Sequence, residues 1–143
     1  HWCINLALEK NGEIIAGVTY DPIKDELFRA EKGSGAFMRN KRLRVSGRKD
    51  LSLSIIGLGG PGPKRRTNRK TFLSEMNAAL IQTAGFRRSG SAALDLAYVA
   101  AGRLDAYWED DLAPWDLAPG MILVREAGGF VTTLSGKGNP VYD

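Results

Sequence analysis

The sequence predicts an α/β protein in which an antiparallel meander of strands precedes a layered strand–helix–strand–helix–strand segment. Up to about Gly47, apolar residues alternate with polar ones as they do in half-buried strands, and turn signals separate the runs. From Leu51 onward, strand-like apolar runs alternate with segments whose apolar residues recur at helical spacing. The 143 residues suffice for a real hydrophobic core, and we divide them into a meander, 1–49, and a layered part, 50–143.

The meander is predicted from its turns and from one regular alternation. Ile4, Leu6 and Leu8 alternate as in a half-buried strand. Asn11-Gly12 predicts a type I′ hairpin turn, because both central residues of that turn need a positive φ. Asp21-Pro22 ends the second strand and is interpreted as a turn. The expected strands cover residues 3–9, 13–20, 25–32, 36–40 and 43–46.

The layered part is predicted from helical apolar stripes and their end signals. Thr67 or Asn68 is the expected cap of the first helix, and Gly102 closes the second. The expected elements are a buried strand within 51–60 that ends in the glycine-rich loop 57–62, helices over 68–82 and 91–102, a strand over 104–109, a helix from about Asp116 to Gly128 and a last strand over 130–134. The core-facing residues are expected to be Phe72, Met76, Ala79, Leu80, Leu94, Ala97, Tyr98, Ala101, Leu117, Met121 and Val124.

Asp116 has two interpretations that spacing alone does not separate. Pro119 lacks an N–H and is tolerated only in a first helical turn, which places the helix start close to Asp116. An Asp at a helix start commonly caps free N–H groups. The same carboxylate is also a suitable ligand for a hard cation such as Mg²⁺.

Composition and charge limit the classes of function. With 43% hydrophobic and 25% charged residues, the chain has the composition of an ordinary soluble globular protein. It has no apolar run long enough to span a bilayer and no signal-peptide pattern, so we expect a cytoplasmic protein with no membrane partner. The single cysteine, Cys3, excludes an internal disulfide and a cysteine-based metal cluster. The only histidine, His1, is terminal and supports neither a Ser-His-Asp system nor a zinc pair.

The net charge of +4 comes largely from one basic cluster, Lys64 to Lys70. Such a cluster attracts polyanions, including nucleic acids. No aromatic residues interleave with it and it leads into a helix, so we expect a solvated loop and regard nucleic-acid binding as the weaker interpretation.

Three features are expected to meet at the ends of the layered elements. The turn Gly90-Ser91-Ala92 opens a helix and offers unpaired N–H groups, Glu109 closes a strand, and Asp116 opens the next helix. In a wound α/β layer, ligands gather at the carboxyl ends of strands and the N-termini of the following helices. Donors and two carboxylates there suit a polyhydroxylated, charged substrate with a hard cation. Taken singly, the turn is also explained as an N-cap and Glu109 as a solvated strand end. The run 57–62 lacks a phosphate-loop pattern.

The segments GSAALDLAYVAAGRLDAYWE and PWDLAPGMILVREAGG resemble the inositol monophosphatase family, in particular its bacterial members. The signature W-D-x-A-x-G followed by E-A-G-G is matched by Trp115, Asp116, Ala118, Gly120, Glu126, Ala127, Gly128 and Gly129. Pro119 stands where the family more often has alanine. GVTYDPIKDELFRAEKGSGAFMRNKRL is similar to the family's central meander, so the resemblance covers essentially the whole chain.

The resemblance implies a fold, a reaction and site residues. The fold would be that of the inositol monophosphatase and fructose-bisphosphatase-like sugar phosphatases. The reaction would be the Mg²⁺-dependent, lithium-sensitive hydrolysis of inositol monophosphate. Asp116 would bind the metal, Gly90, Ser91, Ala92 and Glu109 would bind the substrate, and no residue of this chain is assigned as catalytic. Relatives are commonly homodimers, so we expect one here.

The family's first metal motif, D-P-x-D-G-T, would precede His1 and is absent from these 143 residues, so residues 1–49 would complete an N-terminal subdomain whose start is missing. We therefore expect the chain alone to lack appreciable phosphatase activity. Fructose bisphosphate, histidinol phosphate and phosphoadenosine nucleotides remain alternative substrates. A non-catalytic interaction module that uses the basic cluster is the alternative from another class of function.

Overall fold

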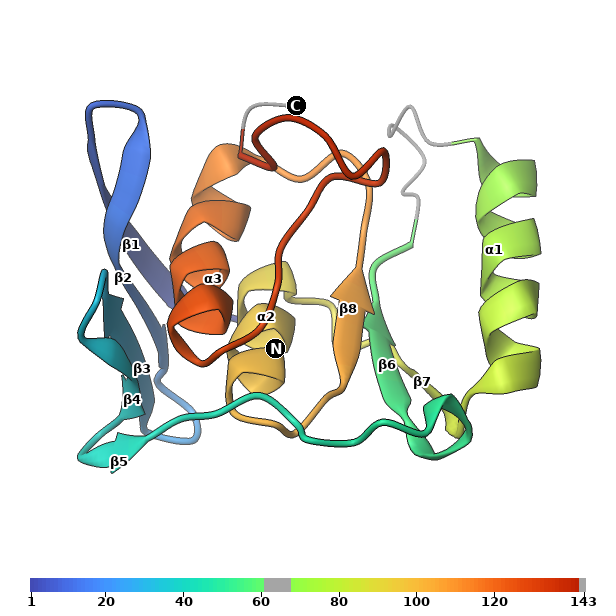
Figure 1. Cartoon of the computed structure of the whole chain (residues 1–143), viewed down its shortest axis with the longest axis horizontal. Helices are drawn as coiled ribbons and strands as arrows, with labels where there is room; N and C mark the ends of the chain where they lie inside the picture. Colours follow the sequence, from blue (N-terminus) through green and yellow to red (C-terminus); the bar gives the residue numbers. More distant parts are fainter. Residues whose placement is uncertain (61–67, 142–143) are drawn as a thin grey trace.

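The structure is a computed structural model that describes residues 1–60 and 68–141. Its elements are β1 (Ile4–Lys10), β2 (Glu13–Asp21), β3 (Glu26–Glu31), β4 (Gly35–Met38), β5 (Lys41–Arg42), a short 3-10 turn (Leu51–Leu53), β6 (Ile55–Leu58), α1 (Arg69–Gln82), β7 (Gly85–Arg87), α2 (Ala92–Ala100), β8 (Ala106–Trp108) and α3 (Pro114–Glu126). One sheet has the order β1-β2-β3-β4-β5 and the other has the order β7-β6-β8. Helices α2 and α3 lie between the two sheets, and α1 flanks the small sheet at the far edge (Figure 1).

The predicted fold class is confirmed in both parts of the chain. Strands β1 to β5 form an antiparallel meander, and β6 pairs in parallel with both β7 and β8. Asn11 and Gly12 have φ of 54° and 79°, as the hairpin turn requires. Asp21 also forms the expected turn, because its Oδ1 accepts hydrogen bonds from the N–H groups of Ile23 and Lys24 at 3.0 and 3.1 Å. The division into 1–49 and 50–143 stays a prediction.

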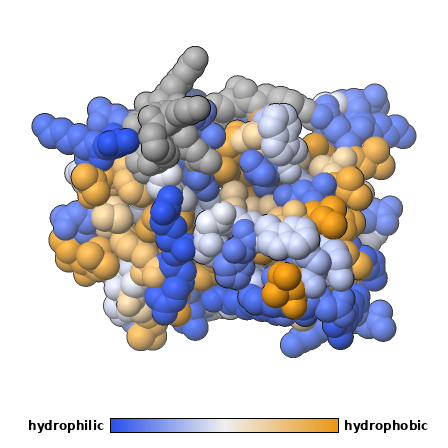
Figure 2. Space-filling view, turned by 180° about the vertical axis from the view of Figure 1, so that it is seen from behind, coloured by the Kyte–Doolittle hydropathy of each residue, from blue (hydrophilic) through white to orange (hydrophobic). Residues whose placement is uncertain are grey.

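The expected burial of the first strand is wrong. Ile4, Leu6 and Leu8 are 51%, 68% and 57% exposed. Ala7 pairs with Gly17 of β2, and a Cβ at Gly17 would point at Ile122 and Pro119 of α3, so the face that α3 covers is the other one. Seen from behind, hydrophobic surface appears in patches between hydrophilic ones (Figure 2).

Two other predicted strands are also wrong. Residues 43–46 form no strand, because β5 ends at Arg42 and the following backbone runs to α3, where the N–H of Val45 donates to the carbonyl of Ala127 at 3.1 Å. Residues 130–134 are irregular, and Phe130 is 91% exposed. Alternating apolar residues form a strand only where a neighbouring strand offers an edge to pair with. Conversely, Gly85–Arg87 form β7, a strand of three residues that was not predicted from the sequence because so short a run shows no alternation.

The three predicted helices are present, with differences at their ends. Asn68 caps α1 by accepting hydrogen bonds from the backbone N–H groups of Lys70 and Thr71, and Ser91 caps α2. Leu80 was expected in the core but is 53% exposed, because α1 buries only Phe72 against the small sheet. None of the described helices is both long and apolar enough to cross a bilayer.

Helix α3 begins earlier than predicted. Its first residue is Pro114, its N-cap is Ala113 without a side-chain cap, and Pro119 lies in the second turn rather than the first. Proline at the first helical position loses no hydrogen bond, because the backbone N–H at that position has no partner within the helix. Pro114 can therefore begin the helix, two residues before the predicted start at Asp116. Gly128, with φ of 89°, ends the helix as expected.

Helix α3 is the centre of the core. Leu123 and Val124 are 0% and 1% exposed, and they belong to a buried cluster with residues of the antiparallel sheet and of α2. In Figure 1, α3 lies between the antiparallel sheet and α2. Close approach depends on two glycines. A Cβ at Gly17 would lie 2.7 Å from the Ile122 side chain, and a Cβ at Gly120 would lie 2.5 Å from Leu96 of α2.

Glu126 of the signature stabilises the meander instead of lining a cavity. Its two carboxylate oxygens accept hydrogen bonds from the backbone N–H groups of Gly33 and Gly35 at 2.9 and 2.8 Å. The β3–β4 turn is thereby attached to the end of α3. Charge-assisted hydrogen bonds of this kind stabilise more than neutral ones.

Asp105 joins the segment before the small sheet to β8. Its carboxylate accepts hydrogen bonds from the Ile55 N–H at 2.7 Å and forms an ion pair with Arg48 at 2.6 Å, and its side chain is only 8% exposed. Burial raises the pKa of this carboxyl, but hydrogen bonds from Ser46, Ile55 and Arg48 outweigh it and hold the pKa below the ordinary 3.8.

A pH-dependent contribution to stability follows for Asp105. Because the folded pKa is depressed, the stabilisation is present above pH 3.8 and is lost as the pH falls through the folded pKa. We expect Asp105→Asn to lower the free energy of unfolding by about 1–3 kcal/mol at pH 7, with a smaller difference in acid. Urea unfolding at both pH values measures it. Asp25→Asn, which removes an ion pair whose side chains are 66% and 73% exposed, is the control and should have little effect. A loss that grows in acid would contradict the assignment.

Candidate functional site

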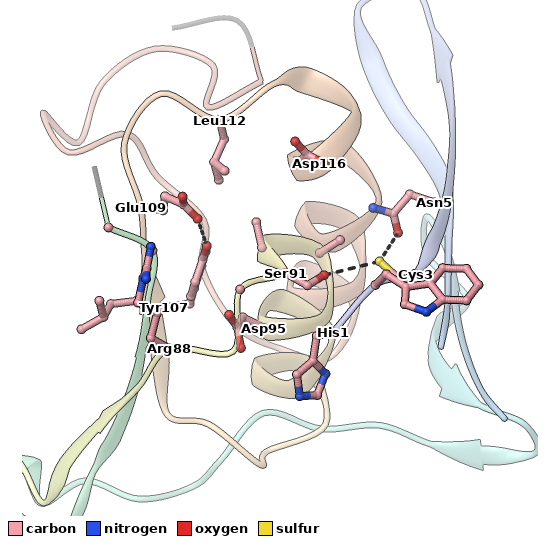
Figure 3. A pocket seen from close by; sticks show the side chains of 17 residues that line it. His1, Cys3, Asn5, Arg88, Ser91, Asp95, Tyr107, Glu109, Leu112 and Asp116 are labelled. Carbon is pink, nitrogen blue, oxygen red and sulfur yellow. Dashed lines mark hydrogen bonds between the residues drawn. The ribbon is translucent and has the colours of Figure 1, made fainter. Parts of the chain in front are cut away.

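A cavity of about 460 Å³ opens at the carboxyl ends of β6 and β8, beside the first turns of α2 and α3 and the start of β1 (Figure 3). Its walls include all five predicted site residues, Gly90, Ser91, Ala92, Glu109 and Asp116. The topology explains this meeting, because parallel strands end at the same edge and the following helices begin there. The structure therefore brings the five residues together, whereas their individual roles stay predictions.

The turn before α2 presents donors to this cavity. Gly90 has φ of 89°, and Ser91 is the N-cap, with its Oγ accepting from the Leu94 N–H at 3.5 Å. The cap interpretation of Ser91 is thus confirmed, and the cap lines the cavity at the same time. N–H groups of a first helical turn have no partner within the helix, so the turn can donate to a hydroxyl or to an anion.

Asp116 is not the cap of α3. Ala113 holds that position, and Asp116 lies in the first turn, half-buried, on the wall of the cavity. The structure gives the Asp116 carboxylate no hydrogen bond or ion pair with another described residue. In Figure 3 it stands at the start of α3, across the cavity from Glu109. Its oxygens therefore remain available for a ligand.

Glu109 follows β8 immediately and is half-buried. The hydroxyl of Tyr107 donates a hydrogen bond to Glu109 Oε2, which Figure 3 shows as a dashed line. Tyr107 and Glu109 are two residues apart, so both side chains leave the strand on the cavity side. Glu109 is thus an oriented acceptor rather than a freely solvated strand end.

Sequence reasoning missed several polar residues of the cavity, among them Cys3, Asn5 and Asp95. Cys3 Sγ lies 3.6 Å from Ser91 Oγ and 3.7 Å from Asn5 Oδ1. Burial is the main cause that raises the pKa of the Cys3 thiol. Asp95 is 2% exposed, and its Oδ2 accepts a hydrogen bond from Ser89 Oγ at 2.6 Å. Burial likewise raises the pKa of its carboxyl.

The positions of these three residues along β1 and α2 could have indicated that they share the cavity with Ser91. Cys3 and Asn5 alternate on the face of β1 opposite Ile4, and Asp95 lies one helical turn after Ser91. The alternation of Ile4, Leu6 and Leu8 predicted that their face of β1 is buried, whereas the opposite face is the one that carries Asn5.

The carboxylate oxygens in the cavity wall determine whether a metal ion fits there. Asp116 offers carboxylate oxygens without a competing hydrogen bond, and oxygen ligands are those that Mg²⁺ prefers. Within residues 1–60 and 68–141, no group of three or more His, Cys, Asp or Glu side chains could hold a metal ion. Asp116 therefore fits as a single carboxylate ligand for such an ion, and its role as a metal ligand stays a prediction.

The basic cluster is only partly described. Its residues 64–67 lie outside the described part of the chain, while Arg69 and Lys70 are exposed at the start of α1. Among the described residues, Arg88 alone brings a guanidinium group to the wall of the 460 Å³ cavity. The described part of the wall thus combines the carboxylates of Asp95, Glu109 and Asp116 with one arginine.

Comparisons with known proteins place the chain in a family. The inositol monophosphatase family model matches residues 1–143. The inositol-1-monophosphatase of Rhizobium meliloti is 51% identical over 141 residues, which are 99% of this chain and 53% of the relative. The Nus factor SuhB of Xylella fastidiosa is 46% identical over 143 residues, 100% of this chain and 52% of the relative. The crystal structure of the extragenic suppressor protein suhB from Bartonella henselae superposes with a TM-score of 0.92 at 51% identity, over 98% of this chain and 53% of that one. The chain spans about half the length of these relatives, and it belongs to the inositol monophosphatase family.

Proposed function

We propose that this chain carries the substrate-binding residues and one metal ligand of a Mg²⁺-dependent phosphatase that hydrolyses inositol monophosphate to inositol and phosphate. The supporting observation is the single cavity that Asp116, Glu109 and the Gly90-Ser91 turn share. Membership of the family supports a phosphatase in general. Magnesium, the inositol substrate, sensitivity to lithium, a homodimer and a cytoplasmic location are the finer parts of the proposal.

Each residue has a distinct task in the proposed reaction. The Asp116 carboxylate binds the cation, which when bound activates water and neutralises charge on the phosphate. The Glu109 carboxylate accepts a hydrogen bond from a ring hydroxyl of the substrate, and the N–H groups of the turn at Ser91 donate to another substrate oxygen. These contacts orient the ester, and orientation with electrostatic stabilisation accounts for most phosphoryl-transfer catalysis.

The proposal predicts that the 143 residues alone release no appreciable phosphate. A single carboxylate does not hold the two metal ions that clamp both the attacking and the leaving oxygen. A chimera in which this chain replaces the matched 141 residues of the Rhizobium meliloti relative is expected to hydrolyse inositol 1-phosphate with millimolar Mg²⁺. Phosphate release by both proteins is the measurement. Comparable turnover by the isolated chain would refute the prediction, and an inactive but folded chimera would refute the proposed function.

Sister substrates are separated by a panel assay on the chimera. The proposal expects inositol 1-phosphate to be hydrolysed with a higher kcat/KM than fructose bisphosphate, histidinol phosphate or a phosphoadenosine nucleotide. A polyol with many hydroxyls can donate to Glu109 and also meet the Gly90-Ser91 turn, whereas a substrate with fewer hydroxyls makes fewer of these contacts.

One comparison favours a second candidate function. The Xylella fastidiosa relative is named a Nus factor, and the basic cluster offers a surface for a nucleic acid or an acidic partner. If the chain is such a binding module, it should bind RNA in a salt-dependent way. Neutralisation of Arg65, Arg66 and Arg69 should then abolish this binding. Binding that is indifferent to this triple change removes the candidate.

A further inference from the structure

Gly59 and Glu109 lie side by side in the cavity wall, directly after the ends of β6 and β8. Leu58 pairs with Trp108 in parallel register, and the N–H of Gly59 donates to the carbonyl of Trp108 at 3.1 Å. Gly59 and Glu109 are therefore the first residues beyond the paired ends of their strands. Both line the 460 Å³ cavity.

Glu109 occupies the space that a side chain at position 59 would need. A Cβ built on Gly59 would overlap the Glu109 carboxyl group, whose carbon and two oxygens are its nearest atoms. The φ of Gly59 lies outside the left-handed region, so the backbone itself does not demand glycine there. Because Gly59 has no side chain, the Glu109 carboxylate can occupy this space.

Tyr107 fixes the same carboxylate from another side. Its hydroxyl donates to Glu109 Oε2, and Figure 3 shows the bond within the cavity wall. The Glu109 carboxylate therefore lies in space that Gly59, directly after β6, leaves open, and it accepts a hydrogen bond from Tyr107 of β8.

We propose that Gly59 and Tyr107 are positioning residues that hold the Glu109 carboxylate against the cavity, and that this placement sets a preference for phosphate esters of polyols over esters without further hydroxyls. The inference rests on the proposed function, because it concerns the acceptor that the substrate hydroxyl would meet. A carboxylate favours a substrate by hydrogen bonding only when that substrate presents a hydroxyl to it.

The chain supplies a matched pair of substitutions. In Gly59→Ala the new methyl group displaces the carboxyl at the far end of a flexible side chain, so the protein can fold while Glu109 moves. In Gly60→Ala the nearest described atoms to the new methyl group belong to the Arg88 guanidinium, at 3.4 Å or more, which is ordinary contact. Tyr107→Phe removes the hydrogen bond without adding an atom to the cavity.

The first measurement uses the 143-residue chain and needs no activity. The ¹³C resonance of the Glu109 carboxyl carbon, assigned by its loss in Glu109→Gln, reports the surroundings of that carboxylate. We expect the resonance to shift in Gly59→Ala and in Tyr107→Phe, and to stay within error of the unmodified chain in Gly60→Ala. An unchanged resonance in Gly59→Ala, or equal shifts in the two alanine variants, overturns the inference.

The second measurement uses the chimera defined above and compares inositol 1-phosphate with phenyl phosphate, which has no other hydroxyl. We expect Gly59→Ala and Tyr107→Phe to raise KM for inositol 1-phosphate about 10-fold, the effect of losing a charged hydrogen bond, and to change phenyl phosphate hydrolysis less than about 2-fold. A general structural disturbance would affect both esters alike, and that result overturns the inference. If the unsubstituted chimera hydrolyses neither ester, the proposed function fails, and the carbon resonance still decides whether Gly59 and Tyr107 place Glu109.

Discussion

Replacing Asp116 by asparagine in the chimera is expected to lower kcat/KM for inositol 1-phosphate roughly 100-fold or more. Substitution of a residue that supports a metal ligand typically lowers metal affinity or activity about 10–100-fold. Substitution of a ligand itself should lower activity at least as much. Asparagine keeps the size and one oxygen but removes the charge that balances the cation. Among residues 1–60 and 68–141, the Asp116 carboxylate has no hydrogen bond or ion pair to lose, so the folded state should be retained. Steady-state phosphate release measures the effect.

Asp111→Asn is the matched control for this substitution. Asp111 is an exposed neighbour on the same β8–α3 connection, and its φ of 58° is one that asparagine adopts readily. The change therefore removes the same charge from nearby without touching the cavity wall at Asp116. Equal losses in the two variants would mean that general acidity, not ligation by Asp116, is responsible. Full activity of Asp116→Asn would refute its role as a ligand.

The largest effect on stability is expected from Leu123→Ala. Leu123, near the C-terminal end of α3, is 0% exposed, and its removal leaves a cavity in the cluster that α3 forms with the antiparallel sheet and α2. Large-to-small substitutions at such positions cost about 2–5 kcal/mol, which is a substantial share of the 5–15 kcal/mol typical of a domain. Urea unfolding followed by circular dichroism gives the free energy of unfolding.

Leu73→Ala in α1 makes the same chemical change in a helix, at a side chain that is 56% exposed. We expect it to change the free energy of unfolding by no more than about 0.5 kcal/mol. Similar losses at the two positions would contradict the central place of α3 in the core.

The fold could be predicted from sequence wherever a local signal has one structural solution. Asn11-Gly12 specifies its turn, and Asn68 and Ser91 specify helix starts, because each satisfies backbone groups nearby. What failed depends on neighbours distant in sequence. Which face of β1 is covered depends on α3, more than 100 residues later, and the irregularity of 130–134 depends on whether a strand edge is available.

The candidate site shows the same limit. The ends of strands and the starts of helices located Glu109, Ser91 and Asp116, because the carboxyl edge of a parallel sheet collects them. The cap interpretation of Asp116 was wrong, since Pro114 moves the helix start and places Asp116 inside the first turn. The consequence of Gly59 had no local signal at all, because the nearest described side chain to a Cβ at that position, Glu109, is 50 residues away.

Binding of Mn²⁺ in place of Mg²⁺ to the 143-residue chain tests most directly whether Asp116 is a metal ligand. The paramagnetic ion broadens the amide resonances of nearby residues in NMR spectra even when its affinity is low. We predict broadening centred on the first turn of α3 and the turn at Ser91, and its loss in Asp116→Asn but not in Asp111→Asn. Broadening that centres elsewhere, or that persists unchanged in Asp116→Asn, would contradict the assignment of Asp116 as the metal ligand.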